Sequence, residues 1–133
     1  MTAESVTYVD SSAIVKLAVT EPESKALRRD LSRRQTLVTS ALARTEVARA
    51  LLPLGPEAVL RGDEVLRRLQ LLRVNDRVLA QAGRMESAEL RSLDAIHLAT
   101  AKQIGPRLKC VVTYDARMVD AARALGWKVF SPK

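Results

Sequence analysis

Cysteine, histidine and aromatic residues are scarce in this chain. Its 133 residues include one cysteine, Cys110, and one histidine, His97, and only 3% are aromatic. A lone cysteine cannot form a disulfide within the chain, and its presence favours a cytoplasmic protein over a secreted one. Cys110 lies in the apolar run KCVVT, which predicts a buried and unreactive thiol. These two residues also cannot supply the cluster of cysteines and histidines that a zinc site requires.

Long apolar segments are missing as well. No stretch of about 18 uncharged apolar residues is present, so we expect no membrane span. The N-terminal sequence MTAESVTYVD lacks the basic residues and the apolar run of a signal peptide. Repeats and low-complexity segments are absent, and we interpret the Pro and Gly residues at 53–56 as a loop. These absences and the chain length predict a single domain over residues 1–133.

Basic residues exceed acidic ones. The chain has 22 Lys and Arg residues against 15 Asp and Glu residues, and its formal net charge is +7. Such a balance favours a polyanionic partner, either a nucleic acid or an acidic protein, although basic side chains also simply keep a protein soluble. The runs RRDLSRR and LRRLQLLR are expected on solvated helix faces, and they are the first candidates for phosphate contact.

Segments with the character of strands and helices alternate along the chain. Strands are predicted at 6–9, 35–40, 69–74, 108–113 and 127–130, and helices at about 13–19, 24–34, 41–52, 57–69, 76–89, 92–105 and 114–126. This alternation predicts an α/β fold with a mainly parallel central sheet that is flanked by helices.

Hydroxyl residues precede several of these helices. Ser11 and Ser12 are expected to cap the first helix, Thr20 the second and Ser92 the helix at 92–105. Gly105, followed directly by a proline, is the expected stop of that last helix.

Four carboxylates stand where such a sheet would bring them together. Asp10 ends the first strand, and Asp115 follows the strand at 108–113 by two residues. Glu46 and Asp94 lie in the first turns of helices that follow loops. Because ligands of open α/β sheets bind beyond the carboxyl ends of the strands, we expect these four side chains to share one rim.

Four neighbouring anions repel one another unless their pKa values rise or a cation lies among them. Mg²⁺ and Mn²⁺ prefer carboxylate and water ligands. A divalent ion lowers the pKa of a bound water, which could then attack a phosphodiester, and either one ion or two could bind. The four carboxylates in a basic chain therefore predict a divalent cation and a polyanionic substrate.

Each carboxylate also has a local explanation. Glu46 could pair with Arg44 or Arg49, Asp94 suits the positive end of a helix dipole, and Asp115 could cap the last helix. Each of these explanations accounts for one residue, and none accounts for a common rim.

Four segments resemble a known family. YVDSSAIVK, TEVARAL, SLDAIHLATA and VVTYDARM follow one another in the order and spacing of PIN-domain proteins, and the resemblance is to VapC-type toxins of bacterial toxin–antitoxin modules. It extends over nearly the whole chain. It implies a PIN-like fold and an Mg²⁺- or Mn²⁺-dependent endoribonuclease that hydrolyses RNA. It also implies a homodimer and a cognate antitoxin protein that blocks the acidic site.

The resemblance assigns the family's four acidic positions residue by residue. They fall on Asp10, Glu46, Asp94 and Asp115, which become the expected catalytic residues and metal ligands. Small hydroxyl residues near the metal site match Ser11 and Thr113, whereas Asp120 is expected on the surface.

Two other functions compete with the ribonuclease hypothesis. One is a phosphohydrolase or receiver domain with a nucleophilic aspartate, but Asp10 is followed by Ser11 and Ser12 instead of a D-x-D-x-T run. The other is a basic module that binds an acidic protein or RNA without catalysis.

Three more side chains have two possible roles each. We expect His97 to hydrogen-bond within the helix packing, although it could be a general base. Lys16 either balances the acidic cluster or lies in solvent, and Tyr114 either packs or stacks on a base.

Overall fold

The fold was established from a computed structural model that describes residues 4–87 and 89–133. Five strands form one sheet in the order β3-β2-β1-β4-β5, and every neighbouring pair is parallel. The strands are β1 (Val6–Val9), β2 (Thr36–Ser40), β3 (Gln70–Leu72), β4 (Leu108–Val112) and β5 (Val129–Phe130). The predicted parallel α/β sheet is therefore confirmed.

Helices follow the strands as the sequence pattern predicted. They are α1 (Ser11–Ala18), α2 (Ser24–Ser32), α3 (Ala43–Leu51), α4 (Pro56–Arg67), α5 (Asp76–Gly83), α6 (Ser92–Ile104) and α7 (Ala116–Ala124), with short 3₁₀ turns η1 (Leu52–Leu54) and η2 (Gly105–Arg107). Helix α5 ends earlier than the predicted helix at 76–89. None of the helices in the described part of the chain is long and apolar enough to cross a membrane.

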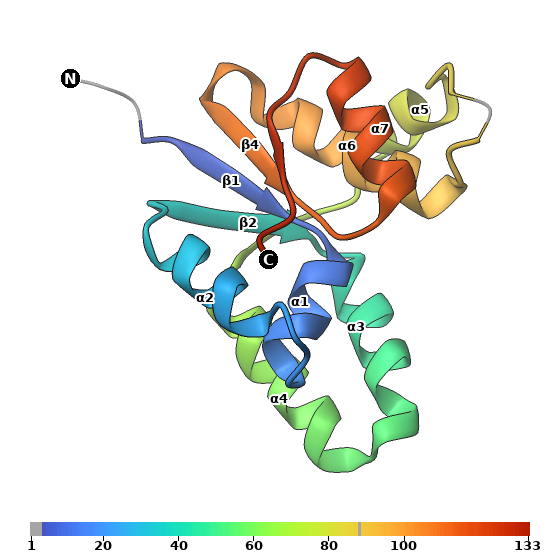
Figure 1. The fold of residues 1–133 in the computed structure, drawn as a ribbon. Helices are drawn as coiled ribbons and strands as arrows, with labels where there is room; N and C mark the ends of the chain where they lie inside the picture. The colour runs from blue at the N-terminus through green and yellow to red at the C-terminus, as the bar shows by residue number, and fades with distance from the viewer. Residues whose placement is uncertain (1–3, 88) are drawn as a thin grey trace.

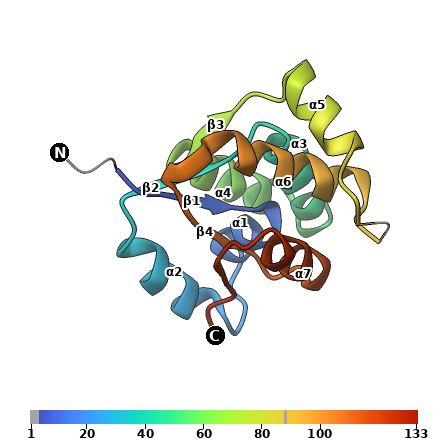
Figure 2. The same cartoon turned by 90° about the horizontal axis from the view of Figure 1, so that it is seen from above.

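The helices cover the sheet from both sides (Figures 1 and 2). Helices α1 to α4 lie on one face, and α5 to α7 lie on the other. The order of the sheet explains this division, because the chain winds outward from β1 to β3 and then crosses to β4 on the opposite side of β1. The carboxyl ends of β1 and β4 therefore form the topological switch point, where sheets of this kind bind ligands.

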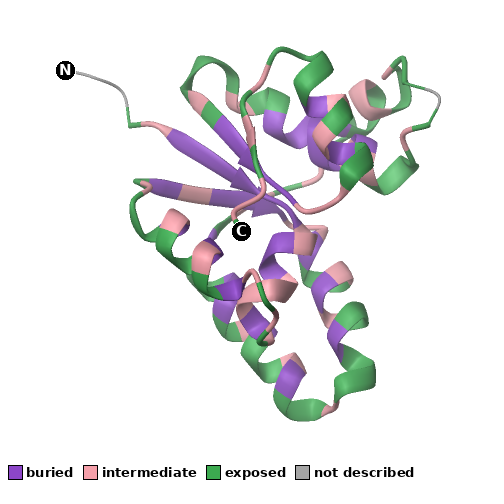
Figure 3. Ribbon diagram, in the orientation of Figure 1, coloured by how far each residue is buried: buried purple, intermediate pink, exposed green. Residues whose placement is uncertain are grey.

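Successive residues of the central strand enter different cores. Val9 packs in a cluster with Ile14 and Leu27, whereas Tyr8 packs with Val111 on the other face. This alternation follows from the two-residue period of a strand, and both faces are apolar because both are covered by helices. The buried strands are visible in the middle of Figure 3. Cys110 of β4 is fully buried as predicted, and burial raises the pKa of its thiol.

Three predicted helix caps are wrong. The side chain of Asp10 itself caps α1 by accepting a hydrogen bond from the Ala13 N–H, so Ser11 and Ser12 are the first residues of the helix. Helix α2 has Glu23 at its cap position and no side-chain cap bond, which excludes Thr20. Ser92 is the first residue of α6 instead of its cap. In each case the helix starts at a different residue from the one that its hydroxyl groups suggested.

Helix α3 was predicted over 41–52, but it runs from Ala43 to Leu51 and continues as η1. Its buried stripe consists of Ala43, Val47 and Leu51, whereas Ala50 is exposed and Leu42 is only partly buried. The stripe therefore lies on the side of α3 that faces α1 and α4.

A glycine allows α3 and α4 to approach closely. A Cβ atom at Gly62 would lie 2.6 Å from Leu51 Cδ1 and 3.0 Å from Val47 Cγ1. Gly83, in α5, has open space around its Cα. Gly62 thus fixes the distance between α4 and the helix that carries Glu46.

Gly62→Leu should destabilise the protein, because a larger side chain overlaps the buried Leu51. Overpacking of this kind costs about 1–3 kcal/mol, which exceeds the gain in helix propensity over glycine. Urea unfolding measures the change in the free energy of unfolding. Gly83→Leu is the matched control and should be neutral or stabilising; equal stability of the two variants would contradict the packing argument.

Candidate active site

Asp10 lies at the carboxyl end of β1 and is only 3% exposed. Its Oδ1 accepts hydrogen bonds from Ser12 Oγ at 2.6 Å and from the Ala13 N–H at 3.2 Å, and its Oδ2 accepts one from Thr113 Oγ1 at 2.5 Å. Burial raises the pKa of Asp10, while the bonds from Ser12 and Thr113 oppose the rise. Both carboxylate oxygens are therefore held in place by the protein.

The two hydroxyl groups that bind Asp10 also bind the loop that follows β4. Ser12 Oγ accepts the Tyr114 N–H at 3.0 Å, and Thr113 Oγ1 accepts the Asp115 N–H at 3.1 Å. Asp10 is thus connected through two side chains to the backbone that presents Asp115. Thr113 was expected near the site, whereas the sequence suggested only a capping role for Ser12.

Glu46 is held by a different pair of residues. Its Oε1 accepts a hydrogen bond from Ser11 Oγ at 2.7 Å and lies 2.5 Å from His97 Nε2. Burial raises the pKa of Glu46, but the hydrogen bond and charge of His97 and the bond from Ser11 outweigh it, so the pKa is lowered overall. In the described part of the chain Glu46 forms no ion pair with Arg44 or Arg49, so that alternative is wrong.

His97 is 2% exposed and lies inside the packing, as expected. Its Nδ1 is 2.6 Å from the hydroxyl oxygen of Tyr8, and its Nε2 faces Glu46. A buried tyrosine and a buried histidine each need a polar partner, and here they are partners of each other. The sequence did not reveal that this pair ends on one of the four carboxylates, because Tyr8, Glu46 and His97 are far apart along the chain.

Asp94 and Asp115 complete the acidic edge. Burial raises the pKa of Asp94, and the negative charges of Asp115, Asp10 and Glu46 raise it further. Asp115 also caps α7, since its Oδ1 accepts the Arg117 N–H at 2.9 Å. Asp115 therefore caps the last helix, as its local explanation predicted, and also lies beside the other acids. The structure brings the four carboxylates close enough for their charges to interact.

The side chains are not arranged as a preformed metal cage. Among residues 4–87 and 89–133, no three acidic, histidine or cysteine side chains converge on one point. Mg²⁺ usually keeps several waters and needs only one or two carboxylates from the protein. The carboxylate of Asp94 and the Oε2 of Glu46 receive no hydrogen bond from the described residues, and hard oxygen donors of this kind fit such an ion.

Lys16 and Tyr114 belong to a neighbouring cluster. Lys16 Nζ binds Glu21 at 2.6 Å and Glu23 at 3.1 Å, and it lies 4.8 Å from the centre of the Tyr114 ring. The Tyr114 hydroxyl donates to the Pro132 carbonyl. Lys16 therefore balances two other acids instead of the four at the edge, and Tyr114 is engaged in packing.

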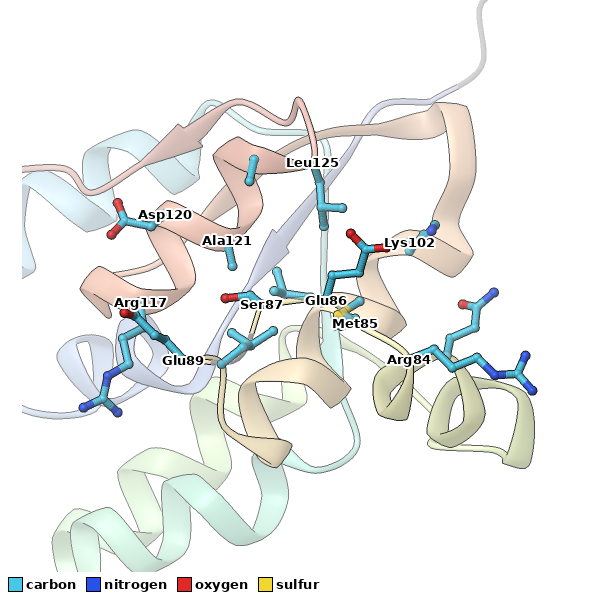
Figure 4. Close-up of a pocket in the computed structure, with 14 residues that line it drawn as sticks. Arg84, Met85, Glu86, Ser87, Glu89, Lys102, Arg117, Asp120, Ala121 and Leu125 are labelled. Carbon is cyan, nitrogen blue, oxygen red and sulfur yellow. The ribbon is translucent and has the colours of Figure 1, made fainter.

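A cavity of about 610 Å³ lies apart from the four carboxylates, between α6, α7 and the segment that follows α5. Figure 4 shows Arg117, Asp120 and Ala121 of α7 on one side of it and Met85 and Glu89 on the other. None of the four carboxylates lines it. The exposed Asp120, which was expected on the surface, belongs to this cavity and not to the acidic edge.

Known proteins are similar to this chain in sequence. The family model described as PIN domain matches residues 7–124. Ribonuclease VapC46 of Mycobacterium tuberculosis is 58% identical over 125 residues, which cover 94% of this chain and 96% of that protein. Ribonuclease VapC35 of the same species is 41% identical over 129 residues, with the same two coverages.

Solved structures share the fold at low sequence identity. The crystal structure of Mycobacterium tuberculosis VapC20, described as a Sarcin-Ricin loop cleaving toxin, has a TM-score of 0.77 at 18% identity and covers 95% of this chain and 99% of its own. A toxin–antitoxin complex from Klebsiella pneumoniae has a TM-score of 0.72 at 16% identity and covers 96% and 98%. At these identities the structures establish the fold alone.

Asp94→Asn should stabilise the metal-free protein at neutral pH, because it removes one charge from a repelling group. The pKa of Asp94 is raised in the folded state, so this carboxyl group favours folding at a pH below its unfolded pKa of about 3.9. Its contribution to the stability is lost as the pH rises through the folded pKa. The variant should therefore match the wild type in strong acid and exceed its Tm at pH 7 by roughly 1–4 °C.

Thermal unfolding in EDTA from pH 3 to pH 8 measures this difference. Asp120→Asn is the control, because Asp120 is exposed and lies outside the acidic edge. A lower Tm for Asp94→Asn at pH 7 would show that the carboxylate is not under repulsion.

Proposed function

Because the chain belongs to the PIN-domain family, whose model matches residues 7–124, we propose that it is an endoribonuclease and the toxin of a toxin–antitoxin pair. Its 58% identity to a protein named ribonuclease VapC46, over nearly the full length of both chains, supports this activity. The observation that carries the proposal is the gathering of four carboxylates at one sheet edge in a chain of net charge +7.

We propose that Mg²⁺ or Mn²⁺ is the cofactor, with Asp10, Glu46, Asp94 and Asp115 as the residues that hold it. When bound, such an ion supplies a water of lowered pKa and neutralises charge on the scissile phosphate. Asp10 is the rigid member of the group, since both of its oxygens are already hydrogen-bonded. Asp94 and the second oxygen of Glu46 have the most freedom to bind an ion directly.

Three exposed arginines lie within three residues of these acids in the sequence. Arg44 precedes Glu46 by two residues, Arg91 precedes Asp94 by three, and Arg117 follows Asp115 by two. None of these arginines forms an ion pair within the part of the chain that the structure describes. Guanidinium groups bind phosphate well, so we propose that these arginines contact the RNA on either side of the cleaved bond.

The phosphohydrolase alternative fits this geometry poorly. A nucleophilic aspartate needs an oxygen that can reach the phosphorus, but Asp10 is almost completely buried and both of its oxygens accept hydrogen bonds. A binding module without catalysis would not need carboxylates that repel one another. The hydrolytic function therefore accounts for more of the site than either competitor.

The partners follow from the same proposal. RNA is the substrate, and the solved complex from Klebsiella pneumoniae supports an antitoxin as the protein partner. We also propose a homodimer and a cytoplasmic location.

Asp94→Asn and Asp10→Asn should lower the rate of RNA cleavage in Mg²⁺ or Mn²⁺ by at least about 100-fold, the upper end of the loss seen when an outer partner of a metal site is removed. Chelation with EDTA should have the same effect on the wild type. The rate is measured on end-labelled RNA, and Asp120→Asn is the control that should cleave normally. Full activity of Asp94→Asn would exclude the proposed site.

Arg44→Ala, Arg91→Ala and Arg117→Ala should each weaken RNA binding uniformly across sequences. Each should also reduce the slope of log affinity against log salt by about 1, as expected for the loss of one phosphate contact. Binding is measured in EDTA so that no cleavage occurs. Arg28→Ala, on α2 away from the edge, is the matched control; an equal effect there would assign the binding to general charge.

A further inference from the structure

We propose that His97, held by Tyr8, is a positioning residue that fixes the carboxylate of Glu46 through one oxygen and leaves the other free to bind a cation. This inference rests on the proposed function, because it assigns a purpose to the free oxygen. It concerns two buried residues that the hydrolytic chemistry itself does not use.

The geometry forms a continuous chain of hydrogen bonds. It runs from the Tyr8 hydroxyl to His97 Nδ1 at 2.6 Å, and from His97 Nε2 to Glu46 Oε1 at 2.5 Å. Ser11 Oγ reaches the same carboxylate oxygen at 2.7 Å. These four residues belong to β1, α6, α3 and α1 respectively, so the chain connects four elements at the edge of the sheet.

Donor and acceptor chemistry determines where the imidazole proton lies. An ionised carboxylate can only accept, so His97 Nε2 must carry the hydrogen that points to Glu46. His97 Nδ1 faces the Tyr8 hydroxyl at 2.6 Å, so both ring nitrogens have a hydrogen-bond partner. Two partners on opposite sides of the ring hold it in one orientation.

Packing prevents the ring from turning. Tyr8 and His97 are 1% and 2% exposed, and their rings meet edge to face with centroids 5.8 Å apart and an angle of 77° between the planes.

The carboxylate of Glu46 is repelled by the other acids and would move toward solvent if it were free. The bonds from His97 and Ser11 oppose that movement and keep Glu46 at the edge.

The same helix carries Asp94 three residues before His97. Residues at this spacing lie on neighbouring positions of one helix face. Anchoring His97 between Tyr8 and Glu46 therefore also sets the rotation of α6 that presents Asp94 to the other acids.

Nitrogen-15 NMR of the metal-free protein tests the orientation directly. The wild type should show a hydrogen on His97 Nε2, in slow exchange with solvent. Tyr8→Phe removes the partner of Nδ1 and should broaden or shift the Nδ1 signal. A wild-type ring protonated only on Nδ1 would overturn the proposal, whatever the protein does to RNA.

Calorimetric titration with Mn²⁺ tests the consequence. His97→Leu should weaken binding by roughly 10–100-fold, as is typical when an outer-shell partner is lost, and His97→Gln, which keeps an N–H donor, should restore most of the affinity. Tyr8→Phe should weaken Mn²⁺ binding in the wild type and have little further effect in His97→Leu, because both changes break the same chain. Thr100→Val is the control for repacking α6, since Thr100 is buried and, among the residues that the structure describes, its side chain bonds only the Ile96 carbonyl.

The outcomes separate the two proposals. Wild-type affinity in His97→Leu would overturn the positioning role and leave the ribonuclease proposal standing. Failure of the wild type both to bind Mn²⁺ and to cleave RNA would overturn the two together. Loss of affinity in His97→Leu with rescue in His97→Gln would support the positioning role.

Discussion

A carboxylate buried at the end of the central strand needs hydrogen-bond partners, and those partners fix the part of the acidic edge that carries Asp10 and Asp115. The charge of Asp10 is enclosed by protein, and an enclosed carboxylate without hydrogen bonds would cost several kcal/mol. Ser12 and Thr113 supply those bonds and at the same time bind the backbone after β4. The requirement of one buried group therefore aligns two loops that are about a hundred residues apart in sequence.

Asp94 is placed against its own electrostatic preference. Asp94 is kept partly buried among three other negative groups, and this raises its pKa. Such a group of like charges destabilises the fold as long as no cation neutralises it. Functional sites commonly carry features of this kind, which selection for stability alone would remove. The neighbouring helix N-termini reduce the repulsion without filling the site.

Much of this arrangement could be predicted from local patterns. Alternating strands and helices indicated the parallel sheet, and each acid followed a strand or began a helix, so their common edge followed from topology. The errors have two causes: the wrong caps concern the residue at which each helix starts, and the missed contacts join residues far apart in the chain. Ser12 resembles a cap in sequence because only the structure shows that Asp10 already fills that position. Likewise, nothing near Glu46 or His97 in the sequence indicates that a tyrosine on β1 connects them.

The position of β4 beside β1 has a consequence for the timing of synthesis. Thr7 is in register with Cys110, and the acidic edge takes Asp10 and Glu46 from the first half of the chain and Asp94 and Asp115 from the second. A nascent chain on the ribosome therefore cannot assemble this edge until its last quarter has emerged. The order of the strands therefore delays assembly of the acidic edge until translation is almost finished.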